Sequence, residues 1–118
     1  MTISTIILYK KRMDLNELTK KVVMVSDQYE KNCDIKRDAD WYILKLHEEV
    51  GELTQNYLSY TLRGRKRNLT QEELKKNISN EVADILGQIL LFANYHDIDL
   101  EKSMEDKWFS YLKLNVDE

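Results

Sequence analysis

The chain has 118 residues, of which 42% are hydrophobic and 33% charged, a balance typical of a helix-rich globular protein. Its net charge of −3 argues against broad attraction to a nucleic-acid polymer, and no apolar stretch is long enough to span a membrane. The only cysteine, Cys33, excludes an internal disulfide and fits a reducing cytoplasm. We therefore expect one cytoplasmic domain over residues 1–118.

The first twelve residues differ in character from the rest of the chain. Residues 2–9 are apolar and β-branched, and the cations Lys10, Lys11 and Arg12 follow them. A signal peptide has its charges before the apolar run, so the order here is wrong for one. We expect residues 1–12 to form a short extended arm that packs on the domain or on a second copy.

Helix start signals predict four helices with short connections. Asp14 with Glu17, three residues on, resembles a capping box, and Thr70 with Glu73 forms another. Gly64 fits a C-terminal cap for the second helix. The predicted helices cover residues 14–31, 38–62, 70–95 and 99–113. With three glycines and no proline, the chain is predicted to be all-α, an antiparallel four-helix bundle.

Two acidic motifs about thirty residues apart carry the main functional signal. Glu48, Glu49 and Glu52 lie in the second predicted helix, whereas Glu81 and Asp84 lie in the third. Acids three residues apart share a helix face, so two packed helices would gather four or five carboxylates at one point. Mg²⁺ or Mn²⁺ is the usual partner of such an all-oxygen cluster. The alternatives are a solvated acidic face for the first motif and a salt bridge for the second.

The third predicted helix is unusually apolar around its acids. Between residues 82 and 93 only Asp84 and Gln88 are polar. A helix that is apolar on all sides is expected to be buried, and a buried carboxylate needs an ion pair or a metal ion. Gly51 lies among the acids of the first motif, where a glycine suggests close approach by another backbone or a ligand.

These motifs resemble those of the MazG-like family of all-α nucleoside triphosphate pyrophosphohydrolases. The segment EEVGEL at 48–53 is similar to the family's first motif, and EVADILGQ at 81–88 is similar to its second. An Asp-Leu pair followed by Lys107 resembles the third conserved stretch. The resemblance covers roughly residues 40 to 110.

The resemblance implies an activity, a cofactor and a set of residues. Members of the family use Mg²⁺ to hydrolyse nucleotides between the α- and β-phosphates, which releases a monophosphate and pyrophosphate in house-cleaning or nucleotide-pool control. By position, the metal ligands would be Glu49, Glu52, Glu81 and Asp84. Glu48 would be a further ligand or would orient or deprotonate the attacking water, and Lys107 would contact a phosphate. Members form dimers or tetramers, so a homodimer or homotetramer is expected.

Other residues near the motifs are candidates for substrate binding. Trp41 precedes the acids by one or two turns and could line a base pocket, although aromatic residues at a helix start also serve as core or interface. Arg63 and Arg65, between the two acidic helices, could reach a triphosphate or simply form a solvated loop. Gln88 stands where members of the family often carry glutamine.

Three other functions share features of this sequence. A phosphoribosyl-ATP or dUTP pyrophosphohydrolase would use the same scaffold, because base choice depends on pocket shape. A non-catalytic helical interaction module would bind a structural or regulatory cation without turning nucleotides over. A di-iron or di-manganese bundle would need Glu-x-x-His, which neither histidine provides.

Overall fold

In the computed structural model, residues 12–112 are described, and they are helical with no strand. The helices are α2 (Leu15–Cys33), α3 (Ala39–Tyr60), α4 (Gln71–Tyr95) and α5 (Leu100–Met104), followed by the π-helical segment η1 (Glu105–Phe109). The all-α prediction is confirmed for this part of the chain. The predicted arm lies outside it except for Arg12. Within residues 12–112 no helix combines the length and apolarity needed to cross a bilayer.

The predicted helix starts are confirmed by the capping hydrogen bonds. The Asp14 carboxylate accepts from the Glu17 N–H at 2.8 Å. Thr70 and Glu73 form a reciprocal capping box, with both hydrogen bonds at 3.1 Å. Each cap satisfies a backbone donor that the first turn of a helix leaves unpaired. The helices therefore begin where local chemistry places them.

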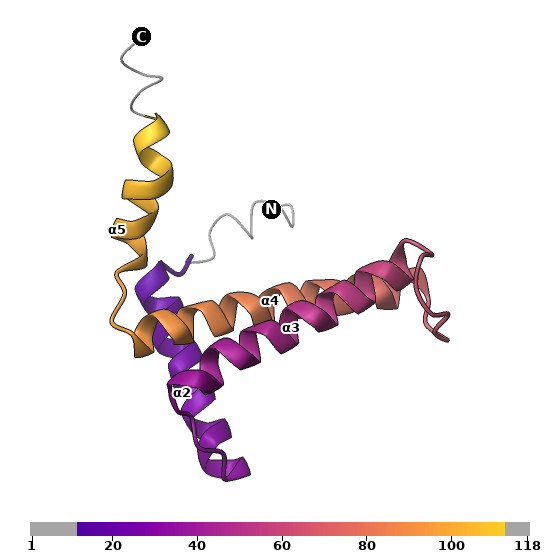
Figure 1. Cartoon of the computed structure of the whole chain (residues 1–118), viewed down its shortest axis with the longest axis horizontal. Helices are drawn as coiled ribbons and strands as arrows, with labels where there is room; N and C mark the ends of the chain where they lie inside the picture. The colour runs from indigo at the N-terminus through magenta and orange to yellow at the C-terminus, as the bar shows by residue number, and fades with distance from the viewer. Residues whose placement is uncertain (1–11, 113–118) are drawn as a thin grey trace, which may run out of the picture.

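Helices α3 and α4 form the main pair of the structure (Figure 1). Tyr42, near the start of α3, stacks on Tyr95 at the end of α4 with ring centroids 4.9 Å apart. Further along, Asn77 Nδ2 donates to Asn56 Oδ1 at 3.4 Å. The two helices of this pair therefore run in opposite directions. Helix α2 packs on α4 and crosses the pair where α3 begins and α4 ends (Figure 1).

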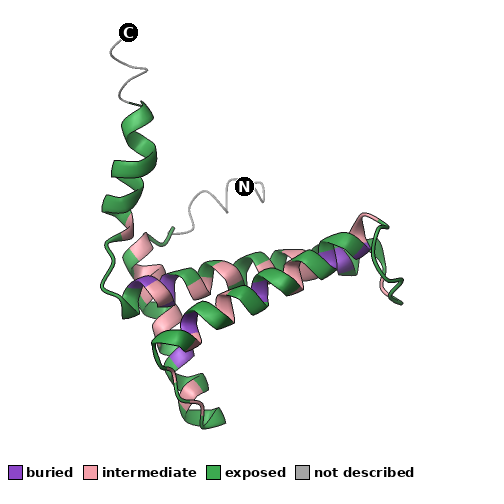
Figure 2. Ribbon diagram, viewed as in Figure 1, coloured by how far each residue is buried: buried purple, intermediate pink, exposed green. Residues whose placement is uncertain are grey.

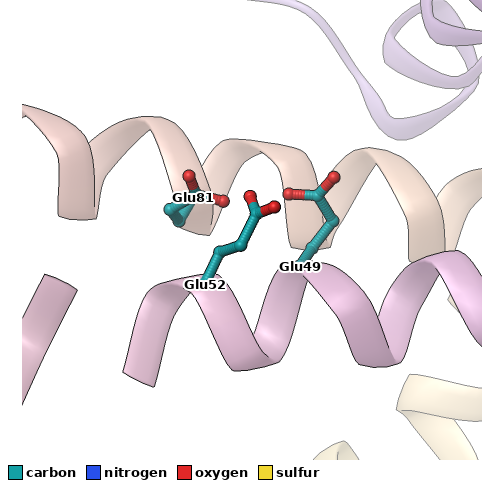
Figure 3. Close-up of side chains that lie close together, drawn as sticks. All are labelled: Glu49, Glu52 and Glu81. Carbon is teal, nitrogen blue, oxygen red and sulfur yellow. The ribbon is translucent and has the colours of Figure 1, made fainter. Parts of the chain in front are cut away.

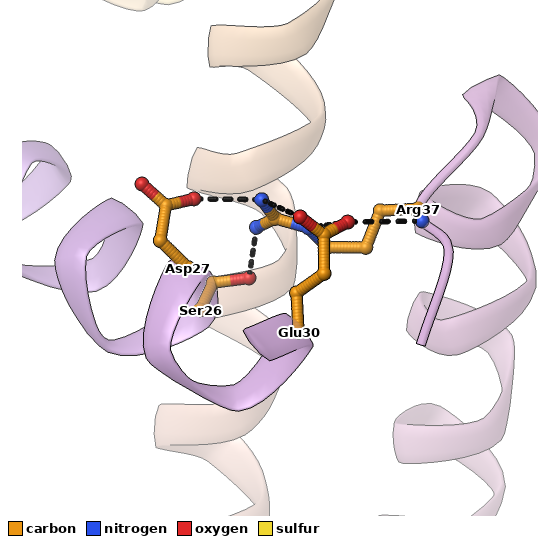
Figure 4. Close-up of polar contacts among 4 residues, drawn as sticks. All are labelled: Ser26, Asp27, Glu30 and Arg37. Carbon is orange, nitrogen blue, oxygen red and sulfur yellow. Dashed lines mark hydrogen bonds and ion pairs between the residues drawn. The ribbon is translucent and has the colours of Figure 1, made fainter. Parts of the chain in front are cut away.

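Arg37, in the connection between α2 and α3, forms hydrogen bonds and ion pairs with side chains of α2 (Figure 4). Arg37 donates from Nε to Glu30 Oε2 at 2.9 Å and from Nη1 to Ser26 Oγ at 2.6 Å. Its Nη2 donates to Asp27 Oδ1 at 2.6 Å. The Arg37 hydrogen bonds lower the pKa of the Glu30 carboxyl. The sequence pattern did not predict this cluster, which holds the residue just before the Asp38 cap of α3 against α2.

The end of α3 differs from the prediction. The helix ends at Tyr60, and Leu62 has a left-handed φ of 61°. The Arg63 N–H then donates back to the Leu58 carbonyl at 2.8 Å, which satisfies one of the last helical acceptors. Gly64 has a negative φ, so it is not the left-handed cap that was expected of it. Leucine takes that conformation instead, although glycine adopts it more readily.

The core of the single chain is small (Figure 2). The buried apolar residues are Tyr42, Leu74, Leu90, Leu91 and Ala93. The expectation that α4 is largely buried is wrong for the single chain, because Val82 is 52% exposed and Leu86 is 46% exposed. Only the faces of α4 turned to α3 and α2 are covered.

Helix α5 and η1 extend away from the α3–α4 pair (Figure 1). Among the described elements, each makes its main contacts with the other. The radius of gyration is 18.2 Å, whereas a compact chain of about 100 residues has roughly 13 Å. Within one chain, therefore, the fourth predicted helix does not close a bundle with the other three.

Candidate metal centre and adjoining cavity

Three carboxylates from the two acidic motifs converge between α3 and α4 (Figure 3). Glu49 and Glu52 stand one turn apart on α3, and Glu81 reaches towards them from α4. One oxygen from each lies within 4.8 Å of the others. Ligand oxygens about 2.1 Å from a Mg²⁺ ion are at most about 4.2 Å apart, so small side-chain movements would close the set around one ion.

Burial makes this carboxylate cluster costly without a cation. Glu49 is only 7% exposed, and the Oε2 atoms of Glu49 and Glu81 are buried without a hydrogen-bond partner. Burial, then a hydrogen bond with Glu81 and the nearby charges of Asp84 and Glu52, raises the pKa of Glu49 to about 7. Burial is also the main cause that raises the pKa of Glu81. The donor set therefore fits a hard divalent ion, which favours the ionised carboxylates.

The described residues supply little positive charge to offset these acids. Lys45 Nζ lies 3.2 Å from Glu48 Oε1 and 3.9 Å from Glu49 Oε1. Within residues 12–112 no ion pair reaches Glu52, Glu81 or Asp84, so the salt bridge considered for the second motif is not formed there. One ammonium group beside several carboxylates leaves the cluster strongly negative.

The remaining two acids of the motifs lie outside the group of three. Asp84 is exposed, which contradicts its expected burial, and it lines a cavity beside Glu49. Its charge still contributes to the raised pKa values of Glu49 and Glu81. Glu48 is exposed and paired with Lys45 at the edge of the cluster.

A cavity of about 530 Å³ adjoins the carboxylates where α2 crosses the pair. Its volume falls within the roughly 300–1,000 Å³ typical of small-molecule sites. Of the predicted substrate-binding residues, Trp41 and Gln88 line it. The wall contributed by α2 was not predicted from the sequence, and it consists of Lys21, Val22, Val25, Ser26 and Tyr29. No signal in the sequence of α2 indicates that this helix packs over the two acidic motifs.

The other predicted substrate contacts lie elsewhere. Lys107 is in η1 and is exposed, and it does not line this cavity. Arg63 and Arg65 lie in the loop at the far end of the pair, eleven or more residues beyond Glu52 (Figure 1). The Arg63 guanidinium instead sits over the Tyr57 ring, 5.8 Å from its centroid. Within one chain these three cations are not gathered at the carboxylates.

The close backbone approach suggested by Gly51 is not found within the described chain, and the suggested contact with a ligand stays a prediction. A Cβ placed there would meet nothing within 4 Å. At Gly87 it would lie 3.9 Å from Val22 Cγ1, an ordinary contact with α2. Neither glycine is required by a close neighbour within the described chain.

A scan against protein-family models and searches of curated proteins and of solved structures found no match for this chain.

Proposed function

We propose that the protein is a Mg²⁺-dependent nucleotide pyrophosphohydrolase of the MazG-like type. It would hydrolyse nucleoside triphosphates between the α- and β-phosphates. The observation that supports this proposal most strongly is that the carboxylates of Glu49, Glu52 and Glu81 converge at one point. One oxygen of Glu49 and one of Glu81 are buried there without a hydrogen-bond partner. Two motifs far apart in sequence meet at one point, and among the described residues no ion pair reaches Glu52 or Glu81.

The chemistry assigns a role to each acid. Glu49, Glu52 and Glu81 would hold the ion, and Asp84 would contribute from the cavity side. Mg²⁺ would supply charge neutralisation for the phosphates and would make the attacking water easier to deprotonate. Water adds to a phosphorus atom, the α–β anhydride bond breaks, and a monophosphate, pyrophosphate and a proton result. Glu48 stands at the edge of the cluster, where it can orient the water or accept the proton.

The cavity offers two cations for the phosphates. Lys45 and Lys21 both line it together with Glu49 and Asp84. A triphosphate carries about four negative charges, so it needs cations besides the metal ion. In this proposal Lys21 and Lys45 contact the phosphates, the role that the family resemblance implied for Lys107.

We also propose that the chain functions as a homodimer or homotetramer whose assembly completes a helical bundle. It exposes 10090 Å² of surface, whereas a compact monomer of this mass exposes about 6,700 Å². Exposed large apolar residues run along α3, α4 and η1, among them Leu44, Val50, Val82, Leu86 and Trp108. A second copy of the chain could cover these exposed apolar faces. Its helices would then complete the bundle that the fourth helix does not close within one chain.

The first experiment measures pyrophosphate release from a panel of nucleoside triphosphates, with and without Mg²⁺. We expect release that depends on Mg²⁺ and falls at least about a hundredfold in Glu52→Gln and Glu81→Gln, because each removes a metal ligand. Glu72→Gln, at an exposed carboxylate in the first turn of α4, is the matched control and should retain activity.

The outcome separates the alternatives. Hydrolysis that survives alanine at both Glu52 and Asp84 would rule the proposal out. Metal binding without turnover of any nucleotide would favour the non-catalytic module. Turnover confined to dUTP or phosphoribosyl-ATP would assign one of the related pyrophosphohydrolases.

A further inference from the structure

The cavity contains one buried polar atom that a metal ion does not explain. Gln88 lines the cavity, and its Oε1 is buried without a hydrogen-bond partner. Glu49 also has a buried oxygen without a hydrogen-bond partner, but in the proposed metal centre that oxygen faces the ion. An unpaired buried amide oxygen is unfavourable unless a ligand or water donates to it. A ligand that brings an N–H group to this wall would satisfy the Gln88 oxygen.

The two ends of the cavity differ in chemistry. Along α4, Gln88 lies one turn, about 6 Å, beyond Asp84. Along α3, Trp41 lies about 12 Å before Glu49. Because α3 and α4 run in opposite directions, Trp41 and Gln88 are both displaced from the three carboxylates in the same direction along the pair, Gln88 by the shorter distance. Leu91 also lines the cavity.

Helix α2 contributes apolar and aromatic side chains to the cavity wall. Val22, Val25 and Tyr29 line the cavity from α2, opposite the residues of α3 and α4. Aromatic and aliphatic side chains can pack against the face of a planar heterocycle. The Gln88 amide can hydrogen-bond to the polar atoms at the edge of such a ring. A glutamine amide presents an acceptor and a donor side by side, the complement of the edge of a nucleobase.

We infer that the Trp41–Gln88 end of the cavity binds the base of the nucleotide and that Gln88 selects the base by hydrogen bonds to its edge. The inference rests on the proposed function, since the metal centre fixes which end receives the phosphates. Trp41 and Tyr29 contact the ring, and the Gln88 amide pairs with an N–H and a neighbouring acceptor. Inorganic tripolyphosphate, which has no base, leaves this end empty.

The test compares Gln88→Leu with the wild-type chain on each nucleoside triphosphate and on tripolyphosphate, all with Mg²⁺. We expect kcat/KM for the preferred base to fall about tenfold and the ratio between bases to shrink towards one, because the lost hydrogen bonds were base-specific. Turnover of tripolyphosphate should change far less. Gln28→Leu makes the same change at an exposed position of α2 outside the cavity and should preserve the base ratio.

A second measurement separates this inference from the proposed reaction. Nucleosides without phosphates are titrated into metal-free Trp108→Phe protein, in which Trp41 is the only tryptophan, and its fluorescence is followed. Saturable quenching that Gln88→Leu abolishes supports the base site even if no nucleotide is hydrolysed. Absence of quenching by every nucleoside, or an unchanged base ratio in Gln88→Leu, would overturn the inference.

Discussion

The α3–α4 pair and the α5–η1 segment are both helical, but only the pair has a core. Leu74, Leu90 and Leu91 of α4 are buried, whereas α5 and η1 contain no buried residue. Both regions begin with well-formed caps, at Thr70 and at Asp99. A cap thus determines where a helix starts. Whether the helix is buried depends on the other helices that pack against it, and the cap does not specify these.

The sharpest way to test this comparison is to truncate one large apolar side chain in each region. Leu90→Ala should lower the free energy of unfolding by about 2–5 kcal/mol, because Leu90 is fully buried. Trp108→Ala in η1 should change it by less than about 0.5 kcal/mol in dilute, monomeric protein, since Trp108 is 63% exposed. Urea unfolding measures both. Equal losses would show that η1 packs on a core.

The acids of the pair should make its stability depend on pH. In metal-free protein the pKa of Glu49 is about 7, against an ordinary value of 4.5. Between these values the folded chain holds a proton that the unfolded chain has lost. Stability should therefore be highest below about pH 4.5 as far as this group contributes, and that contribution should be lost as the pH rises through 7.

The slope of this loss is at most about 1.4 kcal/mol per pH unit for one proton. Glu49→Gln should flatten the profile, and urea unfolding at several pH values measures the difference. Identical slopes for the wild-type and Glu49→Gln chains would contradict the assignment.

Phosphate contacts provide the next comparison between the regions. Lys21→Ala should raise KM for a triphosphate about tenfold, because Lys21 lines the cavity beside the acids. Lys107→Ala should change KM by less than about threefold, because η1 stands apart in the chain. Lys20→Ala, an exposed neighbour outside the cavity, is the control. A larger effect at Lys107 than at Lys21 would mean that assembly brings η1 onto the site.

The smallest expected effect is at the end of α3. Leu62 is 83% exposed and has a φ of 61°, so its side chain adds little packing while its backbone is strained. Leu62→Gly should stabilise the protein by about 1 kcal/mol, measured by thermal or urea unfolding. Destabilisation would indicate that another chain covers the leucine.

Much of the fold could be predicted from local signals. The caps at Asp14 and Thr70 follow from chemistry within one turn of helix. The meeting of Glu49 and Glu81 follows from helix periodicity together with the pairing of adjacent helices. These features need no knowledge of distant parts of the chain.

What the sequence did not predict depends on tertiary placement. The Arg37 cluster and the wall of α2 residues require the angle at which α2 crosses α4, which no local pattern specifies. The burial of α4 was overestimated because an apolar face can be covered by its own chain or by another chain. Asp84 is exposed for the same reason, and its predicted role as a ligand stays a prediction.

The π-helical segment η1 has a consequence for every residue after it. The Ser110 N–H donates to the Glu105 carbonyl, a step of five residues instead of four. One additional residue in a turn rotates the following side chains by roughly 100° relative to an uninterrupted α-helix. A helical wheel drawn through the fourth helix therefore assigns Tyr111 and Leu112 to the wrong sides. Any interface designed on that wheel would be out of phase with the molecule.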